Sequence, residues 1–165
     1  YKEINPGANC VELKVNEDLF TYTAAIKAAL RQNPQWVLLS EARSVEVKYL
    51  MECFSTGLHG LTTLHTDDTR KIPDRIQNMM QDSYAASRME NDIYGFLNVG
   101  VLLRKKANGN GKVIRTVEQI CFFDRVNNEN MAYLMVHNGN LVSREISENL
   151  LNKFERENIK DPFCG

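Results

Sequence analysis

The chain has 165 residues, 43% of them hydrophobic, and a formal net charge of −1, so it is long enough for one domain with a hydrophobic core. Its 20 basic residues are dispersed among 21 acidic ones, which argues against a broad nucleic-acid-binding surface, and its one basic group, Arg104–Lys106, indicates a solvated strand end or turn. No apolar run approaches the roughly 18 residues of a membrane-spanning helix, and the four widely spaced cysteines form no C-x-x-C pair, so we expect a soluble protein in a reducing cytoplasm, without a zinc site or a disulfide framework.

The first 40 residues alternate strand-like and helix-like segments. Val11–Val15 alternates apolar and polar residues, which predicts a strand near a sheet edge. The alanine-rich run Leu19–Gln32 predicts a helix that ends before Pro34, because the residue before a proline disfavours the helical conformation. The unbroken apolar run Trp36–Leu39 predicts a strand over 36–40 that is buried on both faces, as in a parallel sheet covered by helices.

The alternation continues to about residue 80. A helix is predicted over 44–56, with Ser44 as its N-cap and Gly57 as its stop. A strand follows over 61–65, and a further helix begins near Asp68. Strands that alternate with helices in this way predict a parallel sheet.

The second half of the chain is rich in β-strand patterns. After a short helix over 83–92, three strand-like runs are separated by Asn/Gly turns, which predicts antiparallel hairpins: Phe96–Leu103, Lys112–Phe123 and Met131–Val136. An amphipathic helix is predicted over 143–157. No linker separates the halves, so we expect residues 1–82 to form a core portion and residues 83–165 a C-terminal extension of the same domain.

Two ionisable residues follow the predicted parallel strands. Glu41 comes just past the end of the first strand and His65 lies at the exit of the second. Ligands of open α/β sheets bind outside the carboxyl ends of the strands, so neighbouring strands would bring both side chains into one crevice. Two structural interpretations remain open: Glu41 as a carboxylate paired with Arg43, and His65 as a strand-end histidine bonded to backbone.

The residues around these two positions also resemble a known family. The run Ala28–Arg43 resembles the atypical Walker B segment of the type II/type IV secretion ATPases, and Thr56–His65 resembles their histidine box, in the family's order and with a family-like gap. Three residues depart from the family pattern: Ser40 replaces a glycine, Gln35 an aspartate, and Leu58 a histidine, so that the first histidine of the box is His59.

The resemblance implies the C-terminal portion of a RecA-like P-loop NTPase domain, an α/β fold with a parallel sheet flanked by helices. It implies ATP and Mg²⁺ as ligands of the full-length protein, a homohexameric ring, and partners in the inner-membrane secretion or pilus machinery at the cytoplasmic face of the membrane, with no direct nucleic-acid binding. It makes Glu41 and His65 the catalytic residues, with Mg²⁺ held at most through its water shell by Glu41. It assigns phosphate sensing or coupling to Thr63, His59, Arg43, Arg31, Thr56 and Gly57.

One part of such a motor is missing from the sequence. Nothing matches G-x-x-x-x-G-K-[ST], and Asn108–Gly111 indicates a turn. We therefore expect a portion of a longer motor that binds ATP poorly or not at all by itself, since no backbone cradle or lysine is present for the phosphates. The β-rich tail favours the conjugation, type IV secretion and tight-adherence branches. The alternative is a non-hydrolysing docking domain that keeps the fold.

A metal site is a further interpretation of the same segment. His59, His65, Asp67 and Asp68 carry nitrogen and oxygen donors that suit zinc or manganese. Their spacing matches no standard metal motif, however, and either aspartate can serve as a helix N-cap. The sequence therefore predicts no direct metal ligand.

Overall fold

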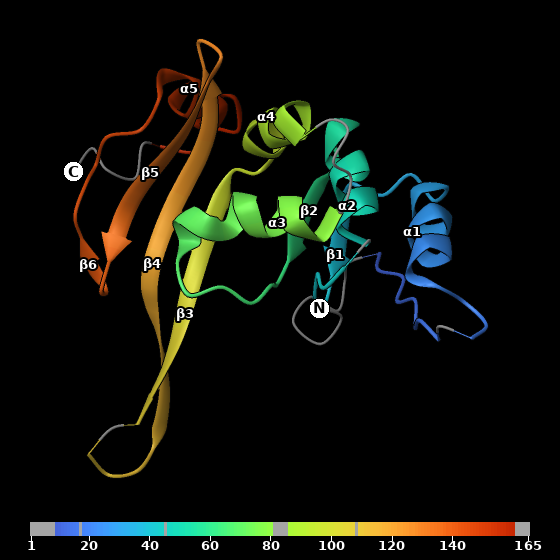
Figure 1. Ribbon diagram of the computed structural model, residues 1–165, viewed down its shortest axis with the longest axis horizontal. Coiled ribbons are helices and arrows are strands. Elements are labelled where there is room, and N and C mark those ends of the chain that lie inside the picture. Colours follow the sequence, from blue (N-terminus) through green and yellow to red (C-terminus); the bar gives the residue numbers. More distant parts are fainter. Residues whose placement is uncertain (1–8, 17, 45, 81–85, 108, 161–165) are drawn as a thin grey trace.

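The computed structural model describes residues 9–16, 18–44, 46–80, 86–107 and 109–160. Its strands form a two-stranded sheet, β1-β2, and a four-stranded sheet in the order β3-β4-β5-β6 (Figure 1). The helices are α1 (Tyr22–Leu30), α2 (Glu46–Ser55), α3 (Ile72–Met80), α4 (Ala86–Phe96) and α5 (Glu148–Arg156), with a short 3-10 turn, η1 (Thr69–Lys71), before α3. The strands are β1 (Trp36–Leu39), β2 (His59–Thr62), β3 (Val99–Ala107), β4 (Val113–Val126), β5 (Glu129–His137) and β6 (Asn140–Leu141).

Strands β1 and β2 are parallel, as the alternating pattern predicts, with Trp36 opposite His59 and Leu39 opposite Thr62. Val37 packs against α1 and α2 in a small core. The other face is open, since Trp36 is 60% exposed and Leu61 64%. The prediction that this strand is buried on both faces is therefore wrong for the described part of the chain, because α1 and α2 cover only the Val37 side.

Other corrections concern where elements begin. Val11–Val15 is not a strand, because a strand needs a hydrogen-bonded neighbour and none of the described residues pairs with it. Strand β2 begins at His59 instead of residue 61, because Gly57 (φ 87°) reverses the chain directly after α2. Helix α2 begins, within the described residues, at Glu46.

The predicted hairpins are confirmed in the second half. β3, β4, β5 and β6 pair antiparallel in succession. Asn127 and Asn128 both have positive φ, as do Asn138 and Gly139, and such paired left-handed residues form the tight turns that match the twist of a hairpin. The predicted helix over 83–92 begins, within the described residues, at Ala86 and continues to Phe96.

The two halves share one hydrophobic core. Side chains of α2, α3 and α4 pack against Cys121 and Phe123 of β4, both fully buried. A side-chain methylene added at Gly100 of β3 would lie 2.5 Å from Ile72 Cδ1 of α3, so the absence of a side chain there lets helix and sheet approach closely. The boundary predicted between residues 82 and 83 lies outside the described residues.

The opposite face of the antiparallel sheet holds α5. Leu150 and Phe154 of this helix pack with Phe122 and Met135. Its N-cap, Ser147, accepts a hydrogen bond from the Leu150 backbone N–H and donates one to a buried aspartate of β4. The C-terminal helix is therefore fixed to the sheet by both apolar and polar contacts.

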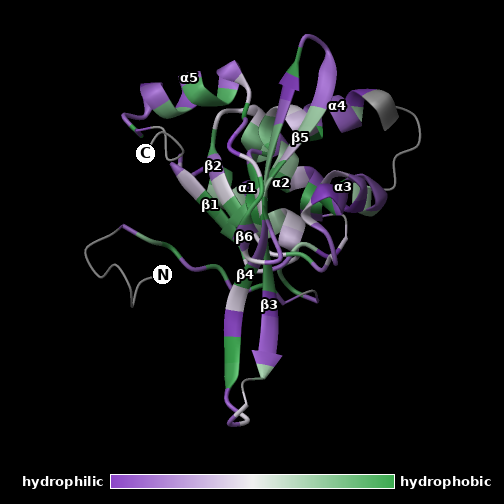
Figure 2. Cartoon of the chain, turned by 90° about the vertical axis from the view of Figure 1, so that its left-hand side faces the viewer, coloured by the Kyte–Doolittle hydropathy of each residue, from purple (hydrophilic) through white to green (hydrophobic). Residues whose placement is uncertain are grey.

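Hairpin β3–β4 projects away from the rest of the molecule (Figures 1 and 2). The predicted solvated basic group lies on it, but two of its members are ion-paired: Arg104 Nε lies 3.1 Å from Glu118 Oε1, and Lys106 Nζ lies 3.4 Å from Glu118 Oε2. Glu118 is 7% exposed and is the extra residue of β4 at a β-bulge, since the register passes from Gln119 to Val117 between Leu102 and Leu103.

Substitution of Gly100 tests the close approach between helix and sheet. We expect Gly100→Ala to lower the free energy of unfolding by about 1–3 kcal/mol, because Ile72 and Phe123 must move to admit the methyl group. Gly95→Ala is the matched control: nothing lies within 4 Å of the added carbon, and alanine in a helix gains about 0.5–1 kcal/mol over glycine. Urea denaturation of both variants measures the difference, and equal stability of Gly100→Ala and the parent chain would contradict this packing.

Candidate functional site

Glu41 lies at the carboxyl edge of the parallel pair, two residues beyond β1. Its carboxylate is shared between two neighbours: Arg43 Nη2 donates to Oε2 at 2.5 Å, and His65 Nε2 lies 3.1 Å from Oε1. The hydrogen bond from Arg43 lowers the pKa of Glu41; burial opposes the shift, and the charges of Arg43 and His65 support it. Glu41 is therefore an ionised carboxylate with a cationic and an imidazole partner.

His65 lies at the same edge, three residues beyond β2. Its side chain is 90% exposed, whereas that of Glu41 is 23% exposed. The predicted convergence of these two residues is present in the structure. The imidazole is thus held at one end by a carboxylate and is otherwise open to solvent, so it is accessible to a ligand that approaches the edge of the sheet.

Thr63 joins the two segments that follow β1 and β2. Its hydroxyl donates to the Ser40 carbonyl at 2.7 Å, and its own carbonyl accepts from the Ala42 backbone N–H at 2.8 Å. Ala42 is 4% exposed and belongs to the main core. These bonds continue the strand pairing beyond the ends of β1 and β2, and they place Glu41 and His65 next to each other.

Glu46 shapes the loop that carries Glu41, and the sequence analysis did not identify it. It is 6% exposed, and its Oε1 accepts from the backbone N–H groups of Arg43 (2.5 Å) and Ser44 (2.8 Å). Ser44 thus meets the start of α2 through its backbone N–H, and its role as N-cap stays a prediction. An acidic residue in the first turn of a helix was the available signal.

Four predicted site residues lie away from this edge. Thr56 and Gly57 directly follow α2, and the Thr56 hydroxyl donates to the Cys53 carbonyl. Arg31 is the C-cap residue of α1, on the segment that leads to β1. His59 is the first residue of β2, although the strand was predicted to begin only at residue 61. Because strand residues rise by about 3.3 Å each, the two edges of this four-residue pair are about 10 Å apart, so the structure does not bring these residues to Glu41 and His65.

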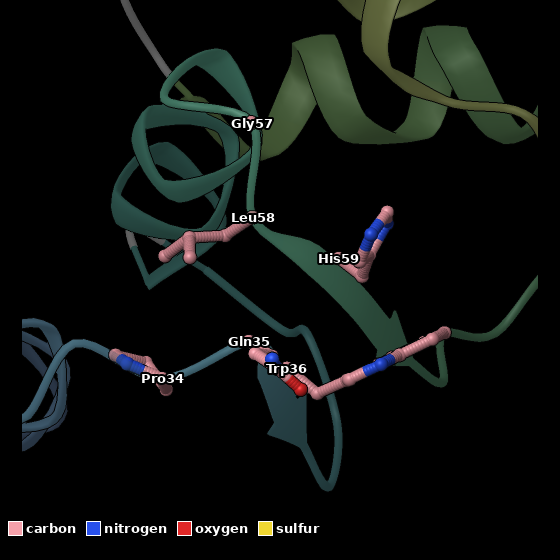
Figure 3. A pocket seen from close by; sticks show the side chains of 6 residues that line it. All are labelled: Pro34, Gln35, Trp36, Gly57, Leu58 and His59. Atoms are coloured by element: carbon pink, nitrogen blue, oxygen red, sulfur yellow. The ribbon is translucent and has the colours of Figure 1, made fainter.

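A pocket of about 410 Å³ lies at the entry edge, lined by Pro34, Gln35, Trp36, Gly57, Leu58 and His59 (Figure 3). The rings of Trp36 and His59 extend from the first residues of β1 and β2, with their centroids 5.1 Å apart. The backbone N–H of His59 donates to the Gln35 carbonyl at 3.2 Å. The first histidine of the predicted box is therefore part of an aromatic pair at the opposite end of the strands from His65.

The two aspartates after His65 have structural partners. Asp68 caps η1 by accepting from the Arg70 backbone N–H, and it also pairs with the Arg70 side chain at 2.6 Å. Asp67 pairs with Lys71 at 3.0 Å. Among the described residues no group of three or more His, Cys, Asp or Glu side chains could hold a metal ion. No described helix is both long and apolar enough to cross a membrane.

Asp68 should make the stability of this turn depend on pH. Its hydrogen bonds to Arg70 lower its pKa from 3.8 to about 2, with burial opposing the shift. A carboxylate with a lowered folded-state pKa contributes stability above its unfolded pKa and loses it as the pH falls toward the folded value. We expect Asp68→Asn, which keeps a capping side chain, to be less stable than the parent at pH 5, with a difference that shrinks steadily toward pH 2.

Urea denaturation of both proteins at pH 5, 4 and 3 measures this difference. Asp18→Asn is the matched control, because the Asp18 side chain forms no ion pair among the described contacts. A stability difference for Asp68→Asn that stays constant over this range would show that the ion pair with Arg70 does not stabilise the turn.

Comparisons with known proteins show which sequences this chain is similar to. The sequence model of the family described as Type II/IV secretion system protein matches residues 3–139. The type II secretion system protein HxcR of Pseudomonas aeruginosa is 31% identical over 75 residues, 45% of this chain and 16% of that protein. An uncharacterised protein of Bacillus anthracis is 34% identical over 103 residues, 59% of this chain and 23% of that protein.

The fold is shared with solved structures of two ATPases called DotB. The Legionella pneumophila protein superimposes with a TM-score of 0.57 at 17% identity, covering 62% of this chain and 27% of that one. The Yersinia pseudotuberculosis protein gives 0.56 at 16% identity, covering 62% and 26%. The chain thus spans less than a third of each of these relatives, and its fold is a portion of a RecA-like ATPase domain.

Proposed function

The chain belongs to the type II/IV secretion system protein family, and from this premise we propose that it is the C-terminal portion of an ATPase that couples ATP hydrolysis to protein or DNA secretion or to pilus assembly. The observation that carries the proposal is the 3.1 Å contact between Glu41 and His65 at the carboxyl edge of the parallel pair. Ligands of parallel α/β sheets bind at that edge. The remaining features of the edge fit a nucleotide phosphate and its metal.

Glu41 fits the role of the acidic residue in this site. Carboxylate oxygens are preferred ligands of Mg²⁺ and of its water shell, and the lowered pKa of Glu41 keeps it ionised. The metal, when bound, neutralises charge on the phosphates. Glu41 itself would orient metal-bound or attacking water, while Arg43, 75% exposed, adds positive charge beside it.

His65 fits the role of a phosphate sensor. An imidazole that contacts Glu41 and is otherwise exposed can donate to a phosphate oxygen and return to the carboxylate when the phosphate leaves. Such a change of partner is a local event that can move a segment. The Thr63 hydroxyl donates to the Ser40 carbonyl, so we assign to Thr63 the positioning of the segments that follow β1 and β2. The sensing role that the resemblance implies for it stays a prediction.

The phosphate-binding loop would come from outside this sequence, which has no G-x-x-x-x-G-K-[ST] motif. Without backbone donors and a lysine for the phosphates, these 165 residues should bind ATP weakly and hydrolyse none. We propose that the longer protein works as a homohexameric ring at the cytoplasmic face of the membrane, on secretion or pilus machinery, and binds no nucleic acid directly. The Arg104 and Lys106 side chains are already paired with Glu118, which fits this last point.

A second candidate function is favoured by one observation. The open face of β1-β2 presents Trp36, Leu38 and Leu61, at least 48% exposed each, beside the pocket lined by Trp36 and His59. Exposed apolar surface of this kind marks an interaction site. On this alternative the chain is a non-hydrolysing docking domain, and Glu41 is a structural partner of Arg43.

Glu41→Gln separates the two candidates. In the longer protein that includes a phosphate-binding loop, we expect the substitution to lower ATP hydrolysis about a hundredfold or more while nucleotide binding is largely kept, because the amide keeps the shape and loses the charge. Steady-state hydrolysis and nucleotide titration measure the two quantities. Glu52→Gln, an exposed position of α2, is the control, and a loss below about threefold in Glu41→Gln would favour the docking domain.

The two histidines should give different phenotypes. We expect His65→Ala to lower turnover and to uncouple hydrolysis from secretion, because it removes the partner of Glu41. His59→Ala should leave turnover within about threefold and affect coupling between subunits, because His59 lies at the opposite end of the strand pair, whose two ends are about 10 Å apart. Parallel hydrolysis and secretion assays measure both variants. Loss of hydrolysis in His59→Ala with normal hydrolysis in His65→Ala would reverse the assignment.

A further inference from the structure

A buried hydrogen-bond network joins the segment after His65 to the antiparallel sheet. Thr69, the first residue of η1, is fully buried, and Gln119 of β4 is 5% exposed. The Thr69 backbone N–H donates to Gln119 Oε1 at 2.8 Å, and the Thr69 hydroxyl lies 3.0 Å from the same oxygen. One side-chain oxygen of the sheet thus binds the backbone N–H and the hydroxyl of the residue that begins the turn.

The orientation of the Gln119 amide follows from these contacts. A backbone N–H can only donate, so the Gln119 atom that faces Thr69 is the oxygen. The amide nitrogen then faces His137 Nδ1 on β5, at 3.3 Å. Since an amide NH₂ also only donates, Nδ1 of His137 is the acceptor. Each end of the Gln119 side chain therefore has one defined partner, and the network runs from η1 across β4 to β5.

This network lies between the proposed sensor and the projecting hairpin. Thr69 follows His65 by four residues, and α3 begins directly after η1. On the other side, Gln119 is adjacent to Glu118, the bulge residue of β4 that is ion-paired with Arg104 of β3. Buried, hydrogen-bonded side chains of this kind have few alternative arrangements, so a displacement of η1 is expected to displace Gln119 and the part of β4 that carries it.

We propose that Gln119 is a positioning residue that anchors the His65 segment to the antiparallel sheet, so that movement of His65 is transmitted to β4 and the hairpin. This inference rests on the proposed function, because His65 is expected to move only if it senses a phosphate. The anchor itself rests only on burial and distances. Loss of the Gln119 oxygen leaves the buried Thr69 N–H without a partner, and that unpaired donor favours opening of the turn.

Hydrogen exchange on this 165-residue chain tests the anchor without ATP. Gln119→Met keeps the length of the side chain and removes the acceptor, so the Thr69 amide should exchange at least tenfold faster, while amides of α2 keep their rates and show that the fold is intact. Asn130→Leu is the matched control, because Asn130 lies on β5 of the same sheet and its amide bonds to Asn91 and Glu90 of α4, away from η1. Unchanged Thr69 exchange in Gln119→Met would overturn the proposal.

Kinetics in the longer ATPase test the connection to His65. Gln119→Met should lower kcat at least fivefold with KM for ATP unchanged, and it should have no further effect in a His65→Ala background, because the two act as one unit. Thr69→Val, which loses only the hydroxyl bond, should lower kcat less, and Thr69→Ser should keep the parent value. Independent, multiplying effects of Gln119→Met and His65→Ala would overturn the proposal.

The two experiments separate two kinds of failure. A faster Thr69 amide together with an inactive longer protein, or one that is indifferent to Glu41→Gln, would leave the anchor in place and reject the proposed hydrolysis. An active, Glu41-dependent enzyme whose Thr69 amide is unaffected by Gln119→Met would keep the proposed hydrolysis and reject the anchor.

Discussion

The two hydrogen bonds of Thr63 decide where the candidate site lies. β1 and β2 are only four residues long, and without further pairing their exits could diverge after Leu39 and Thr62. The bonds to Ser40 and Ala42 extend the ladder into the loops, and the burial of Ala42 fixes that extension to the core. Because the geometry of Glu41 and His65 depends on these backbone contacts, the two side chains meet without a rigid element of their own.

The segment from β2 to α3, which carries His65, is also attached to the antiparallel sheet. Thr69 is bonded to β4 through Gln119, and Ile72 packs against the surface that Gly100 leaves open. The connection from β2 to α3 is therefore fixed at both ends, with His65 between them and largely exposed. Such an arrangement suits a residue that exchanges partners, because a change of partner at the imidazole then acts on a segment that is attached to both sheets.

Sequence reasoning located Glu41 and His65 because each follows a short apolar run, and the edge at which parallel strands end is set by the fold. It failed for His59, since the start of β2 depends on how quickly Gly57 reverses the chain. It also missed Gln119, whose contact with Thr69 spans 50 residues and leaves no periodic signal. The expectation that both faces of β1 are buried was wrong. An apolar run indicates which residues can be buried, but in the described part of the chain helices cover only one face of the strand.

Trp36 is the only tryptophan of the sequence, and it lies on the open face of β1-β2 at 60% exposure, with the His59 ring 5.1 Å away. The chain therefore carries its own optical reporter at that face. Indole emission shifts to shorter wavelength when water is replaced by apolar surroundings. Fluorescence of the unmodified protein can thus show whether another surface covers β1-β2, with no label and no substitution.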